Sequence, residues 1–163
     1  MTPEAALTDT VIRAAQAARA YPDDASCAPW LVTCAVLAAQ QAAAIALRAV
    51  GDGIPQQSGA TELLLRAATK DRLPPPFTLP FSLASRRAFE RLVEARNTYM
   101  HPRGMTWFVS QDTLALGLPV ICASIRHLIL TQPALADLVS PAEAAQIDDS
   151  LRDVEALASF LSD

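Results

Sequence analysis

One short stretch of this chain combines the side chains that can cleave a phosphodiester without a metal ion. Between Ala95 and Pro102 the sequence places an arginine, an asparagine and a histidine: Arg96, Asn97 and His101. Arginine is a permanent cation that binds phosphate through a planar fork, and an imidazole that titrates near neutrality can act as general acid or general base. These three side chains are therefore the candidate catalytic residues.

Arg96 falls on the apolar side of the helix expected to carry it. Phe89, Leu92, Val93, Arg96 and Met100 recur at the steps of three and four residues that define one helix face. A cation in that position needs a partner, a bound ligand or a second subunit, because an unpaired charge is costly to remove from water.

The helix that carries these residues is predicted to run from about Ser82 to Tyr99 or Met100. It must stop at His101, because Pro102 disfavours helical geometry in the residue before it. On an ideal helix, residues five positions apart are rotated by about 140°, so the side chains of Arg96 and His101 diverge. They converge only if the helix unwinds at Met100 and His101, or if two subunits each contribute one residue.

The run Arg96-Asn97-Thr98-Tyr99-Met100-His101 resembles the Arg-polar-x-x-x-His signature of the HEPN superfamily of helical domains. In that family the signature ends a helix of an α bundle, a long apolar helix lies upstream, and two protomers commonly pair so that both motifs line one cleft. The resemblance implies an all-α, up-and-down bundle of five to six helices, formed as a single HEPN-like domain over residues 1–163, and a homodimer.

The resemblance also implies an activity, which is metal-independent endoribonuclease action in a toxin or defence role. His101 would act as general acid or base, and Arg96 would bind the scissile phosphate and stabilise the charge that develops on it. Asn97 would orient His101 or contact the phosphate, and Arg103 would add a phosphate contact. The expected products carry a 2′,3′-cyclic phosphate and a free 5′-hydroxyl, and no cofactor or metal is expected.

A second function remains open, which is a catalytically silent HEPN-like module that dimerises or binds a protein partner. A nucleotidyltransferase-like antitoxin is an example of such a partner. The corresponding structural interpretation of the motif is a salt-bridged Arg96, a helix-capping Asn97 and a His101 stabilised by the dipole at the helix C-terminus.

The charge distribution limits how the chain can contact nucleic acid. Its net charge is −4, which excludes a protein that coats nucleic acid with its whole surface. The segment from Arg86 to Arg103 nevertheless contains five arginines and two glutamates. Contact with RNA is therefore expected to be local. The alternative for Arg86, Arg87 and Arg91 is a solvated helix face with Glu and Arg pairs.

The composition favours helices, because hydrophobic residues make up 52% of the chain and aromatic residues only 6%. Ser140, Pro141 and Glu143 supply an N-cap, a first-turn proline and the third-position glutamate of a capping box. The prolines at 74–76 favour a stiff, extended connection. Besides the motif helix, we expect helices at about 3–20, 29–51, 61–69, 119–131 and 141–161.

Several features favour a cytoplasmic protein. Cys27, Cys34 and Cys122 form no metal-binding or disulfide pattern and are expected to be buried as thiols. Residues 25–47 are uncharged and long enough to cross a bilayer, but they are rich in alanine and contain two central glutamines, which is more typical of a buried helix in a bundle. We also expect the rings of Trp30 and Trp107 to pack in the core or in a lid over the site, and His127 to have a structural role.

Overall fold

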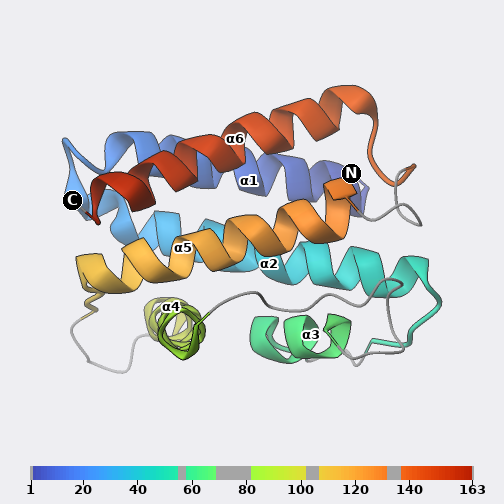
Figure 1. Cartoon of the computed structure of the whole chain (residues 1–163), viewed down its shortest axis with the longest axis horizontal. Coiled ribbons are helices and arrows are strands. Elements are labelled where there is room, and N and C mark those ends of the chain that lie inside the picture. Colours follow the sequence, from blue (N-terminus) through green and yellow to red (C-terminus); the bar gives the residue numbers. More distant parts are fainter. Residues whose placement is uncertain (1, 55–57, 69–81, 102–106, 132–136, 163) are drawn as a thin grey trace.

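The structure is a computed structural model, and it describes residues 2–54, 58–68, 82–101, 107–131 and 137–162. These residues form helices and contain no strand, which confirms the all-α class. Four helices run along the long axis and two lie together on one side of them (Figure 1). The four are α1 (Pro3–Ala20), α2 (Ala28–Ala49), α5 (Gln111–Ile125) and α6 (Pro141–Phe160), and the two are α3 (Ala60–Ala67) and α4 (Leu83–Met100).

The direction of α4 departs from the expected up-and-down arrangement. Figure 1 shows α4 nearly end-on, so this helix crosses the long axis of the other four. The crossing is close because α5 has a glycine where α4 passes: a Cβ built on Gly117 would lie 2.5 Å from Cδ1 of Leu92 and 3.2 Å from the backbone carbon of Ala88. Small residues at the contact let two helix backbones approach, which fixes the position of the helix that carries the motif.

The starts of α1, α4 and α6 follow from local sequence, as expected. Thr2 and Ser82 accept hydrogen bonds from backbone amides in the first turns of α1 and α4. Ser140 and Glu143 form a complete capping box, in which each side chain bonds to the backbone of the other residue. These hydrogen bonds satisfy amides that have no partner within the helix.

The fifth helix begins earlier than the sequence analysis predicts. We expected Pro119 in a first turn, but α5 begins at Gln111 and Pro119 lies inside it. The earlier start has a local cause, because the Ser110 hydroxyl accepts from the amide of Thr113. After Ile125 the chain continues as a π-helix, Arg126–Thr131.

The apolar helices α2 and α5 form the centre of the bundle. Both are long and apolar enough to cross a membrane by length and composition, but 67% of each apolar window is buried inside the bundle, which is typical of core helices. All three cysteines are free thiols; Cys34 and Cys122 are buried and Cys27 is half-buried.

Trp30, expected in the core, is instead 62% exposed in the first turn of α2, at the rim of an open cavity. The proline run at 74–76 lies outside the described residues.

Candidate functional site

Arg96 points from α4 toward α2 and is half-buried. Its Nη2 atom donates to Oε1 of Gln40 at 2.6 Å, while its buried Nε atom has no hydrogen-bond partner. Among the described residues no carboxylate forms an ion pair with Arg96. Burial lowers the pKa of this guanidinium, although an arginine remains charged at any physiological pH. The site therefore contains a cation whose charge no described carboxylate compensates.

Gln40 holds Arg96 in place from the middle of α2. Its carbonyl oxygen accepts from Arg96, and its Nε2 atom donates to the backbone carbonyl of Ser58 at 2.8 Å. The two ends of one amide thus connect α4 to the segment before α3. Because both partners are fixed, the side chain of Gln40 has one defined orientation.

The motif helix ends where the sequence predicts. α4 continues through Met100, and His101 is its C-cap with a non-helical backbone (φ −130°, ψ 66°). The amide of His101 still donates to the carbonyl of Asn97 at 3.0 Å. The helix therefore keeps its register up to the Cα atom of His101, and no unwinding brings this side chain round toward Arg96.

This register separates the three candidate catalytic residues into two groups. Asn97 and His101 are four positions apart, so they lie one turn apart on the same stripe of α4, and both are exposed. Arg96 is rotated from His101 by about 140° and faces α2. Within one chain the structure brings Asn97 and His101 together, but it does not bring Arg96 to them.

Trp107 packs against the last turns of α4. Its indole N–H donates to the carbonyl of Ala95 at 2.8 Å, and its ring meets Tyr99 edge-on with centroids 6.2 Å apart. Trp107 is half-buried, so its role is packing, whereas Phe108 is 79% exposed. A groove of about 310 Å³ lies between this segment and the face of α4 that carries Arg91, Glu94 and Thr98.

The other arginines of this region lie in solvent where they are described. Arg86 forms an exposed pair with Glu90 at 3.1 Å, as expected for a solvated helix face. Arg87 and Arg91 are exposed as well. Arg103, the expected additional phosphate contact, lies outside the described residues.

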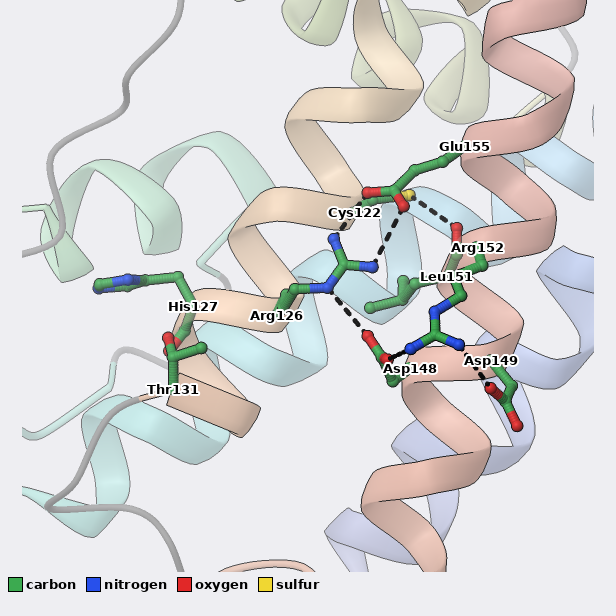
Figure 2. Close-up of polar contacts among 9 residues, drawn as sticks. All are labelled: Cys122, Arg126, His127, Thr131, Asp148, Asp149, Leu151, Arg152 and Glu155. Carbon is green, nitrogen blue, oxygen red and sulfur yellow. Dashed lines mark hydrogen bonds and ion pairs between the residues drawn. The ribbon is translucent and has the colours of Figure 1, made fainter.

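The second histidine belongs to a different region. His127 lies in the π-helix after α5, is half-buried, and has its pKa lowered by that burial. Figure 2 shows its ring pointing away from the neighbouring ion-pair network, in which Arg126 donates to Asp148 and to both oxygens of Glu155. Asp148 also bonds to Arg152 at 2.6 Å. This paired network joins α6 to the end of α5 and is structural.

The described residues contain no cluster of three or more His, Cys, Asp and Glu side chains that could hold a metal ion. Comparisons with protein families, with curated proteins and with solved structures found no match to the chain. The candidate site therefore has to be judged on its own geometry.

Sequence reasoning missed the role of Gln40. A signal was present, because Gln40 and Gln41 are two adjacent amides in the middle of an otherwise apolar helix. A polar side chain in such a position is retained inside a fold only with a hydrogen-bond partner. A search for a buried donor would have pointed to the arginine on the apolar face of the next long helix.

Proposed function

We propose that this chain is a metal-independent endoribonuclease of the HEPN type that acts as a homodimer. The observation that carries the proposal is the uncompensated charge of Arg96. Among the described residues, the neutral amide of Gln40 is the one hydrogen-bond acceptor of this half-buried guanidinium, and no carboxylate neutralises it, which favours an anion as its counter-charge. Burial strengthens the attraction between this cation and a phosphate, because water screens the charges less.

The proposed roles follow from the side chains. Arg96 binds the scissile phosphate and stabilises the extra negative charge of the transition state. His101, exposed at the end of α4, transfers a proton to or from the 2′-hydroxyl or the leaving oxygen. Asn97, one turn before it, orients the imidazole or donates to the phosphate. The products are RNA ends with a 2′,3′-cyclic phosphate and a 5′-hydroxyl, and the biological role is that of a toxin or a defence enzyme.

A dimer is part of the proposal because Arg96 and His101 diverge on an intact helix. A two-fold axis near the end of α4 would bring Arg96 of one subunit to His101 of the other. Two large apolar side chains of the same turn support an interface there, since Tyr99 is 42% exposed and Met100 51% exposed.

The first test is cleavage of a labelled RNA by the purified protein in the presence of EDTA. Arg96→Ala and His101→Ala should each lower the cleavage rate by about 10²-fold or more. His127→Ala is the matched control for histidine, and Arg87→Ala is the control for an exposed arginine of the same helix; both should retain activity. Full activity in His101→Ala would rule out the proposed acid–base role.

A second test asks whether the two residues come from different subunits. A mixture of Arg96→Ala and His101→Ala chains, unfolded and refolded together, forms heterodimers in which one of the two shared sites is intact. About a quarter of the wild-type rate should then return, because half of the dimers are mixed and each has one working site. If both residues of a site belong to one chain, the mixture stays inactive.

One observation favours the second function, a catalytically silent module for dimerisation or for a partner such as a nucleotidyltransferase-like antitoxin. The hydrogen bond from Arg96 to Gln40 already gives this cation a structural role. A silent module predicts no RNA cleavage at any pH and a partner that co-purifies with the chain. Cleavage that is lost in the motif variants would eliminate it.

A further inference from the structure

Helix α2 reaches solvent along one narrow stripe. Within residues 31–47 the positions that are not buried are Leu37, Gln40, Gln41 and Ala44. Leu37 is 39% exposed, and Trp30, two turns before it, is 62% exposed. Trp30, Leu37 and Ala44 lie seven positions apart. This spacing is typical of side chains that pack along a second helix. We call these three residues the α2 stripe.

The first half of the α2 stripe borders an open groove between α1 and α2. The groove has a volume of about 540 Å³, and all of its lining residues fall within 9–37, which is a continuous described segment. Its apolar lining residues are Ala17, Cys27, Trp30, Cys34 and Leu37. A large exposed indole beside an apolar groove indicates a surface that packs against another protein.

The α2 stripe is complementary to itself about Leu37. Trp30 lies seven positions before Leu37 and Ala44 lies seven positions after it. When a second α2 packs antiparallel with both copies of Leu37 on a two-fold axis, Trp30 of each copy lies opposite Ala44 of the partner subunit. A large side chain then meets a small one at both ends of the contact. A two-fold interface requires such self-complementarity, because the same surface is used on both subunits.

The charges at the two ends of α2 favour the same arrangement. Arg48 is exposed in the last turn of α2 and forms no ion pair with a described residue. Asp24 is exposed before the other end, where its carboxylate accepts from the amide of Ser26. In the antiparallel contact position 48 lies opposite position 26, so Arg48 reaches Asp24 of the partner subunit. Two antiparallel helix dipoles also attract each other.

We propose that the α2 stripe is a two-fold interface with a second copy of this chain. The two α2 helices pack antiparallel across Leu37, and Arg48 pairs with Asp24 of the partner subunit. This contact is independent of the dimer proposed at the end of α4, because neither Tyr99 nor Met100 belongs to the stripe or lines its groove. A chain that uses both interfaces forms an assembly larger than a dimer.

Cross-linking through single cysteines tests the two-fold axis. In the full chain with Cys27→Ser and Cys34→Ala, Leu37→Cys should form a covalent dimer on mild oxidation, because a residue on the axis meets its own copy. Trp30→Cys should not, because its two copies would lie about 21 Å apart along the helices and a disulfide needs Cα atoms within about 7 Å. A mixture of Trp30→Cys and Ala44→Cys chains should form the covalent dimer. Absence of a cross-link through Leu37→Cys, or an equally efficient one through Trp30→Cys, would overturn the proposal.

Self-association provides a second readout. Leu37→Glu places two like charges on the axis and should lower the average mass in sedimentation equilibrium. Leu116→Glu is the matched control at an exposed leucine of α5, and its average mass should equal that of the wild type. Met100→Glu disturbs the interface proposed at the end of α4 and should leave the Leu37→Cys cross-link unchanged. An average mass of Leu37→Glu equal to that of the wild type contradicts the α2 interface.

A charge exchange tests the antiparallel register without altering the apolar stripe. Arg48→Asp and Asp24→Arg should each weaken self-association about tenfold, because two-fold symmetry repeats the ion pair. The two substitutions in one chain should restore it. Weakening by both single variants without recovery in the double variant would show that the two charges do not meet, which excludes this register.

Discussion

The contact between Gly117 and Leu92 gives a sharp prediction for Gly117→Ala. In an exposed helix interior, replacing glycine by alanine stabilises a protein by about 1 kcal/mol, because alanine has the higher helix propensity. Here we expect the opposite sign. The new Cβ atom would lie 2.5 Å from Cδ1 of Leu92 and 3.1 Å from its Cγ atom, whereas carbon atoms in contact are normally about 3.5–4.0 Å apart.

The size of the effect follows from the surroundings. Leu92 is completely buried, so a movement of its Cδ1 atom disturbs the surrounding core, and the backbone of Ala88, 3.2 Å from the new atom, must shift as well. Overpacking of a core costs about 1–3 kcal/mol, and the short distance places this site in the upper half of that range. After the gain in helix propensity is subtracted, Gly117→Ala should lose about 1–2 kcal/mol of unfolding free energy and lower Tm by about 3–6 °C.

Urea denaturation followed by circular dichroism measures this difference. Gly53→Ala is the control, because no atom lies within 4 Å of the added Cβ, and it should change stability by less than about 0.5 kcal/mol. Leu92→Val shortens the opposing side chain, so it should cost less in the Gly117→Ala background than in the wild type. If Gly117→Ala is more stable than wild type by the full propensity gain, the close crossing of α4 and α5 is wrong.

Two further predictions concern the last helix. Ser140→Ala removes the hydroxyl that caps α6, so it should lower the free energy of unfolding, measured by urea titration, by about 1 kcal/mol. An unchanged free energy of unfolding would show that the capping box does not form in solution. The hydrogen bond from Arg126 lowers the pKa of Asp148 in the folded protein. The ionised carboxylate therefore stabilises the fold at pH values above the unfolded pKa of about 4. This contribution to stability is lost as the pH falls through the lower pKa of the folded state. The unfolding free energy of Asp148→Asn should therefore fall less in acid than that of the wild type. Urea titrations at a series of pH values measure this difference, and an unchanged pH dependence would contradict the ion pair.

The sequence predicts those features of the fold that depend on neighbouring residues. The hydroxyl caps at Thr2, Ser82 and Ser140 mark three helix starts, and Pro102 marks the end of α4. These signals act within a few residues, so the chain itself reveals them.

Features that depend on distant residues could not be predicted in the same way. The start of α5 is not of this kind, because its N-cap, Ser110, is a local signal, which the preference of proline for a first turn at Pro119 obscures. The direction of α4 depends on Gly117, whose role is visible only when Leu92 lies against it. The bond between Gln40 and Arg96 joins residues 56 positions apart: each is a polar residue among apolar ones in its own helix, but neither pattern specifies that the two side chains meet.

The hydrogen bond from Trp107 to the carbonyl of Ala95 gives the end of α4 an optical reporter. The chain has two tryptophans, and their surroundings differ: Trp30 is 62% exposed, while Trp107 is half-buried and bonded to the helix backbone. In a Trp30→Phe protein, all indole emission would come from the one ring that contacts Ala95 and Tyr99 near the end of α4. A change in its emission wavelength or in its quenching by iodide would then report directly on whatever binds to the last turns of α4 or moves them.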